Sequence, residues 1–154
     1  MARKQDTAVI TAAAERHILS YCADLTSPVY QTSTQRAAKL ATYYLPSISI
    51  LTDGTMTRLS DPSQYAELIA GPLDKVGSLP RVGGHRIDAI SENSAIIWLF
   101  LEVNGMEISN VYFFRNMGNG VEGFEGGFLT MIQDSRVVKE AVGAEKAEIL
   151  TILG

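Results

Sequence analysis

The segment Ala95–Phe114, AIIWLFLEVNGMEISNVYFF, decides how the rest of the chain can be arranged. Two apolar runs flank Asn104-Gly105 within it. An Asn-Gly pair between hydrophobic runs is the strongest short-range signal for a β-hairpin, because a type I′ turn needs positive φ at both central residues. This turn also fixes the register, so that Ile97 is expected opposite Tyr112. The sequence therefore predicts a long antiparallel hairpin with a defined pairing.

This register gives the hairpin two faces, and both are too apolar to face water. One face comprises Ala95, Ile97, Leu99, Leu101, Met106, Ile108, Asn110, Tyr112 and Phe114. The other comprises Ile96, Trp98, Phe100, Glu102, Glu107, Ser109, Val111, Phe113 and Arg115. An antiparallel sheet usually has one buried face and one solvated face. We therefore expect one face to cover a core or pocket and the other to meet a second protein.

Length and composition limit the class of protein. The chain has 154 residues and a net charge of −4, and a domain of this size buries roughly 70% of the surface that its unfolded chain exposes. No linker divides it, so we expect a single domain over 1–154. The negative charge argues against nucleic acid as a partner, and no stretch is long enough to span a bilayer. Cys22 is the single cysteine, which excludes an intramolecular disulfide and a cysteine metal cluster. We expect a cytoplasmic protein that uses no cofactor and no metal.

Periodicity and turn residues predict the elements on either side of the hairpin. Apolar residues at helical spacing predict a helix over 6–25. The other expected elements are a second helix capped by Thr34 and ended by Pro46, a short hairpin over 47–59, a third helix capped by Ser60 or Asp61, strands over 85–91 and 121–132, and a closing helix from Asp134 or Ser135. Helices grouped on one face of an antiparallel sheet make an α+β fold.

This order of elements resembles the nuclear transport factor 2-like superfamily, in particular its SnoaL-like branch. The stretches that carry the resemblance are Tyr21-Cys22-Ala23-Asp24, Tyr43-Tyr44-Leu45-Pro46, Asp61-Pro62, the meander, and Val121 to Ile132 followed by Gln133-Asp134-Ser135. The resemblance covers nearly the whole chain and lies in the arrangement of elements more than in a motif. It implies a curved antiparallel sheet wrapped around helices, shaped as a cone with a pocket at its wide end. Members include ketosteroid isomerase, scytalone dehydratase, limonene epoxide hydrolase, polyketide cyclases, fungal meroterpenoid isomerases and non-catalytic binding modules.

The residues of the concave face follow from this resemblance and from the register. By comparison with the family's final hairpin, the face of Asn110 and Tyr112 is the concave one. Continuing the register through the preceding turn pairs Asp88 with Ile97, so Arg86 and Asp88 are expected on the same face. We therefore predict a group of four polar side chains inside an apolar cone.

These side chains suit general acid/base chemistry. Desolvation raises the pKa of a carboxyl such as Asp88 unless Arg86 pairs with it, and a carboxyl poised nearer neutrality can move protons between carbons. Tyr112 and Asn110 can donate hydrogen bonds to an enolate or carbonyl oxygen. His17 lies on the inward stripe of the first helix, where ketosteroid-isomerase-like members carry a polar donor, and the resemblance implies that it assists.

The same residues also have a structural interpretation. Arg86 and Asp88 can form an ion pair at the open rim, where such pairs contribute little. Asn110 and Tyr112 can be satisfied polar groups of the core, because buried polar groups are generally hydrogen-bonded. The alternative for His17 is a histidine at the rim. The sequence leaves both interpretations open.

Further candidates lie on neighbouring strands. Asp53 stands near the end of the first short strand, where family members carry catalytic carboxylates, but the following glycine explains it as a turn residue. Glu122 is a second alternative base, in the last strand. His85 is expected on the face opposite to Asp88, in a structural or interface role. The predicted substrate-binding residues are Tyr21, Tyr44, Tyr65, Arg86, Leu99 and Phe128.

These features predict a cofactor-independent enzyme of secondary metabolism. It would isomerise, cyclise or dehydrate an apolar small molecule that contains a carbonyl group. The alternative is a non-catalytic ligand-binding or assembly module of the same fold. Large apolar patches usually mark interfaces, so the second face is expected to form a two-fold homodimer. The interface residues predicted for it are Ile96, Trp98, Phe100, Val111 and Phe113.

Overall fold

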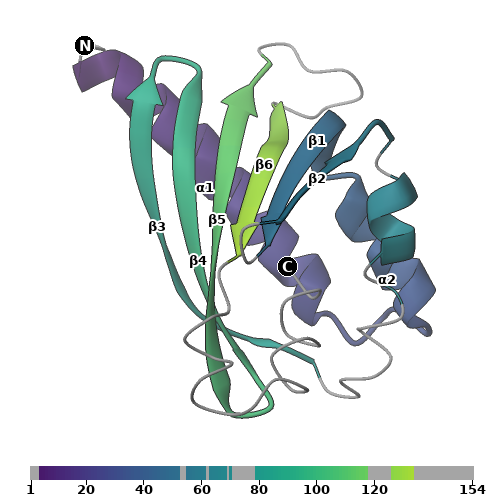
Figure 1. Ribbon diagram of the computed structural model, residues 1–154. Coiled ribbons are helices and arrows are strands. Elements are labelled where there is room, and N and C mark those ends of the chain that lie inside the picture. The colour runs from purple at the N-terminus through teal and green to yellow at the C-terminus, as the bar shows by residue number, and fades with distance from the viewer. Residues whose placement is uncertain are drawn as a thin grey trace.

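The computed structural model describes residues 4–52, 55–61, 63–68, 70, 79–117 and 126–133. A curved six-stranded sheet is crossed on one face by the long helix α1, Lys4–Thr26, as Figure 1 shows. Helix α2, Ser33–Ala41, contacts α1. A short helical segment covers residues 63–68. The α+β class and the curved sheet predicted from the sequence are confirmed.

The sheet has the strand order β2-β1-β6-β5-β4-β3. Its strands are β1 Tyr44–Thr52, β2 Thr55–Leu59, β3 Arg81–Ser91, β4 Ser94–Val103, β5 Met106–Asn116 and β6 Gly126–Gln133. The sheet is mixed rather than purely antiparallel, because β1 and β6 run parallel to each other. The other neighbouring pairs are antiparallel. The parallel pair therefore joins the β1–β2 hairpin to the meander formed by β3, β4, β5 and β6.

The central hairpin has the predicted register. Ile97 lies opposite Tyr112, and Asn104 and Gly105 take φ values of 53° and 80° at the turn. Both values are positive, as a type I′ turn requires. Because a one-residue slip would move every side chain to the opposite face, this turn determines which residues of β4 and β5 face α1.

The core lies between α1 and the concave face of the sheet. Residues of α1 at helical spacing are buried against side chains from alternate positions of the strands, as expected for an amphipathic helix on a half-buried sheet. The largest fully buried side chains are Tyr21, Tyr65, Tyr112, Phe114, Phe128, Ile10, Ile18, Leu40, Ile48, Ile97 and Leu99. Each such residue contributes about 1.5–3 kcal/mol by leaving water. The interior is rich in aromatic rings, several of which carry hydroxyl groups.

Strand β3 departs from the predicted register. Ala89 lies opposite Ala95 and Ser91 opposite Ser94, so Ile90 is an extra residue in the ladder. Such a bulge reverses the alternation on one side of it. Asp88 therefore lies opposite Ile96, not Ile97, and the prediction that it faces the concave side is wrong.

Other expected boundaries also shift. Helix α2 is capped by Thr32 and not by Thr34, since the Thr32 side chain accepts a hydrogen bond from the Gln35 backbone amide at 3.1 Å. Pro46 lies inside β1, at a shift in its pairing with β6. The turn at 53–54, the first part of the predicted strand over 121–132, and the closing helix lie outside the described residues.

Gly126 is predicted to tolerate no side chain. A Cβ atom there would lie 2.0 Å from the Arg115 carbonyl oxygen, whereas a Cβ at Gly83 would lie 3.4 Å from the Phe100 carbonyl oxygen. We expect Gly126→Ala to lower the free energy of unfolding by about 2 kcal/mol or more, because the strands must move apart. The control Gly83→Ala should change it by less than about 0.5 kcal/mol. Urea unfolding followed by circular dichroism measures both, and equal midpoints for the two variants would contradict this packing.

Candidate functional site

A chain of buried hydrogen bonds crosses the concave face from β6 to β5. The Gln133 amide nitrogen donates to the Asn110 side-chain oxygen at 2.9 Å, and the Asn110 amide nitrogen donates to the Tyr112 hydroxyl at 3.2 Å. Asn110 and Tyr112 have no exposed surface. The pairing of the strands places these groups together, since Asn110 lies directly opposite Gln133. The prediction that Asn110 and Tyr112 share the concave face is confirmed.

Tyrosine hydroxyls continue this network into the core. A hydrogen bond joins Tyr112 to Tyr21 of α1, and the Tyr44 hydroxyl donates to the Tyr65 hydroxyl at 2.9 Å. Burial raises the pKa of Tyr21, Tyr44 and Tyr112 well above 10, and the neighbouring tyrosines raise it further. These hydroxyls therefore stay protonated near neutral pH and remain hydrogen-bond donors.

Gln133 has an acceptor that the fold leaves unused. It is 2% exposed, and its Oε1 atom has no hydrogen-bond partner among the residues that the structure describes. A buried acceptor without a donor costs about 1–3 kcal/mol. A molecule that supplied a donor at this atom would recover that free energy. The sequence does not indicate Gln133, because the predicted last strand ends at residue 132 and because the skipped Leu129 shifts the alternation on β6.

His17 connects α1 to the start of β1. Its Nε2 atom lies 3.0 Å from the Tyr43 carbonyl oxygen, and since a carbonyl only accepts, this nitrogen carries a proton. The ring packs against Phe114 and Phe128, with centroids 5.0 and 4.7 Å away. His17 is thus a buried residue that holds the helix against the sheet, and its predicted assistance in catalysis stays a prediction.

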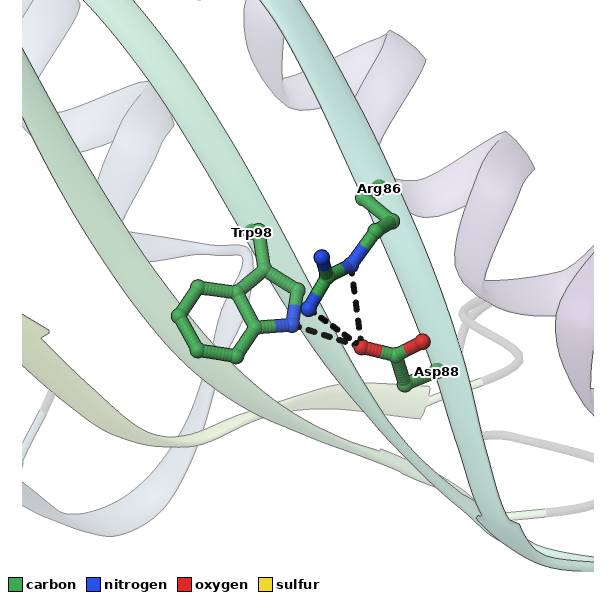
Figure 2. A network of polar contacts seen from close by, with 3 residues as sticks. All are labelled: Arg86, Asp88 and Trp98. Atoms are coloured by element: carbon green, nitrogen blue, oxygen red, sulfur yellow. Dashed lines mark hydrogen bonds and ion pairs between the residues drawn. The ribbon is translucent and has the colours of Figure 1, made fainter.

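Asp88 and Arg86 lie on the convex face, contrary to the prediction. Figure 2 shows Asp88 Oδ2 accepting hydrogen bonds from Arg86 Nε at 3.1 Å and from the Trp98 indole at 2.8 Å. The Arg86 guanidinium also lies 4.8 Å above the Trp98 ring. The Asp88 side chain is 51% exposed. The bulge at Ile90 is the cause, and it removes Asp88 as a base inside the cone and Arg86 as a residue of its lining.

The same bulge brings His85 to the concave side. His85 lies opposite Leu99 instead of on the outer face, and its Nε2 atom is 2.7 Å from a carboxylate oxygen of Glu15 on α1. It thereby links the edge strand β3 to the helix. The prediction that His85 lies on the opposite face of the sheet from Leu99 is therefore wrong.

The remaining site candidates divide into two groups. The predicted apolar wall residues are all buried in the core, namely Tyr21, Tyr44, Tyr65, Leu99 and Phe128. The alternative bases Asp53 and Glu122 lie outside the described residues. Among described residues with an assigned exposure, no Asp or Glu side chain is buried. In that part of the chain the interior polar groups are hydroxyls, amides, the imidazole of His17 and the guanidinium of Arg36.

The described residues give two further results on possible sites. No group of three or more His, Cys, Asp or Glu side chains there is placed to hold a metal ion. No helix in the described part of the chain combines the length and the apolar composition that crossing a membrane requires.

Comparison with known proteins identifies the fold. No protein-family model and no curated protein matches the chain. A solved structure of an NTF-2-like protein of unknown function from Shewanella oneidensis is 5% identical, with a TM-score of 0.58 over 80% of this chain and 98% of that one. A candidate ketosteroid isomerase from Shewanella frigidimarina is 13% identical, with a TM-score of 0.56 over 80% and 96%. A candidate scytalone dehydratase from Novosphingobium aromaticivorans is 12% identical, with a TM-score of 0.52 over 85% and 87%. These similarities establish a nuclear transport factor 2-like fold, and they establish no activity.

Proposed function

We propose that this protein binds a small, neutral, largely apolar molecule at the concave face of the sheet. The observation that carries the proposal is the buried Oε1 atom of Gln133, which has no partner within the described part of the chain. This atom stands at the end of a hydrogen-bond chain whose other members are paired. A ligand with a hydroxyl or N–H group would complete the chain.

The chemistry of the surrounding residues favours a neutral ligand. The network consists of amides and protonated tyrosine hydroxyls, so a charged ligand would lose its hydration without gaining a counter-charge from these groups. The aromatic rings beside the network favour an apolar body, as the stacked pair Tyr112 and Phe128 illustrates with centroids 4.3 Å apart. The ligand class is therefore an apolar molecule with a single donor group.

Two probes that differ only in this donor test the proposal. We expect 4-cyclohexylphenol to bind about tenfold more tightly than its methyl ether, because only the phenol can donate to Gln133, and one hydrogen bond is worth about that factor. Gln133→Met should remove the preference, and Thr130→Val on the outer face of the same strand should keep it. Isothermal titration calorimetry measures the affinities, and thermal melting verifies that each variant is folded. Equal affinities of the wild-type protein for the two probes would contradict the proposal.

Catalysis on such a molecule is the second candidate function. In this candidate the chain belongs to the SnoaL-like branch and isomerises, cyclises or dehydrates a carbonyl compound of secondary metabolism. The observation that favours it is the pair of buried donors, the Tyr112 hydroxyl and the Asn110 amide, because preorganised donors stabilise a developing oxyanion. The base would be Asp53 or Glu122, since Asp88 lies on the other face.

Isomerisation of 3-cyclohexenone to its conjugated isomer tests this candidate by ultraviolet absorbance. We expect Asp53→Asn or Glu122→Gln to reduce the rate by about 10²–10⁴-fold, which is the usual contribution of a general base. The Asp88→Asn variant should isomerise 3-cyclohexenone at the wild-type rate, because this carboxylate faces solvent. Wild-type protein that is no faster than buffer would contradict catalysis and would leave the binding proposal standing.

We propose a second copy of the chain as the partner of the convex face. Phe100 and Ile132 on this face are 41% and 37% exposed. The register makes the patch continuous, with Ile96 opposite Phe113, and Trp98 opposite Val111. A two-fold axis would set this patch against itself, and tryptophan and arginine, as in the network of Figure 2, are frequent anchors of interfaces.

A charge placed in the patch tests the dimer. Phe100→Glu should give a monomer, because a carboxylate buried between the two copies would lose its hydration without a partner. Met56→Glu is the matched control, since Met56 is an exposed apolar residue on β2. Light scattering coupled to gel filtration reports the mass of each protein. Monomeric wild-type protein at micromolar concentration would overturn this arrangement.

A further inference from the structure

A groove of about 460 Å³ opens at the end of the sheet where β6 begins. It lies at the opposite end of β6 from Gln133, and the proposed function makes no use of it. Its lining residues are Leu45, Pro46, Asn93, Arg115, Asn116, Met117 and Leu129. This volume is in the range of small-molecule sites, roughly 300–1,000 Å³.

Irregular pairing on both sides of β6 forms the groove. Leu129 has no partner in the ladder with β5 or in the ladder with β1, because both registers shift around it. Beside it, Ser47 of β1 has a φ of 61° directly after Pro46. Positive φ at a residue such as serine costs about 1–3 kcal/mol, and residues strained in this way cluster at functional sites. Bulges likewise re-aim side chains next to such sites. The groove is therefore built by the strands that line it.

Two polar side chains of the groove, Arg115 and Asn93, offer hydrogen-bond donors. The Arg115 side chain is exposed and makes no hydrogen bond or ion pair with the residues that the structure describes. The Asn93 side-chain oxygen already accepts from the hydroxyls of Ser91 and Ser94 at 2.9 and 3.3 Å. The group that Asn93 can offer a ligand is thus its amide nitrogen, which is a donor. Among the lining residues that the structure describes, no carboxylate neutralises Arg115.

The remaining lining is apolar. Leu45, Pro46, Met117 and Leu129 provide aliphatic surface beside the guanidinium. Arginine binds a carboxylate through two parallel hydrogen bonds, and such charge-assisted bonds are about twice as strong as neutral ones. A cation and an amide donor next to an aliphatic wall match a molecule with an anionic head and a hydrocarbon tail.

We propose that this groove binds an amphipathic carboxylate, with its head on Arg115 and its tail along Leu45 and Leu129. The site differs from the concave face in both position and charge preference. The concave face offers neutral donors and an unpaired acceptor, and the groove offers a positive charge. The two proposals can therefore fail separately.

Octanoate and 1-octanol, used below their aggregation limits, are suitable probes because they share a tail length and differ in head group. We expect octanoate to shift the amide resonances of Arg115, Asn93 and Leu129 in the ¹⁵N-labelled full chain, with saturation. Arg115→Gln should weaken octanoate binding by about tenfold or more and leave octanol binding unchanged. Arg58→Gln, which removes an exposed arginine on β2, should bind octanoate as the wild-type protein does.

Three results would overturn the proposal. The first is an octanoate response confined to the amides of Asn110, Tyr112 and Gln133, which would place the probe at the concave face. The second is an equal loss of affinity in the Arg115 and Arg58 variants, which would show attraction to net charge alone. The third is a response to octanoate that does not saturate.

Discussion

The register of the β4–β5 hairpin is the constraint on which the rest of the structure depends. The turn at Asn104-Gly105 fixes it, and strict alternation then assigns every side chain of both strands to one face. The concave face receives the aromatic rings and the amide of Asn110, and α1 packs on it. The convex face receives a second apolar set that nothing in the described part of the chain covers. One local turn thus determines both the interior and the outer surface.

The sequence predicts this part of the fold well because the signal is local. Asn-Gly needs no distant partner to favour its turn, and the apolar residues of α1 repeat at helical spacing. The position of Asp88 could not be derived in the same way. Ile90 is a bulge, and an isoleucine gives no sign of one because it is typical of regular strands. This extra residue in β3 exchanges the faces of Asp88 and His85. Asp88, predicted as an acid inside the cone, therefore forms an ion pair at the surface.

The candidate site illustrates a similar limit on strand β6. The faces of Asn110 and Tyr112 could be predicted because the register of β5 is counted from the turn at Asn104-Gly105. The face of Gln133 could not be predicted in this way, because the skipped Leu129 shifts the alternation of side chains along β6. The structure thereby changes the character of the site from an acid with two donors to a network of neutral groups. Such a network recognises shape and hydrogen bonding, and chemistry at it would need a base from elsewhere in the chain.

The parallel pairing of β1 with β6 also has a consequence for the order in which the protein folds. Tyr44 meets Phe128 across more than half the length of the chain, whereas β3, β4 and β5 pair with their immediate neighbours in sequence. A two-stranded ribbon such as β1–β2 is marginally stable on its own. During synthesis the edge of β1 therefore stays unpaired until β6 has left the ribosome. The three-stranded meander can form earlier, and closing the long loop between β1 and β6 is the step expected to limit the folding rate.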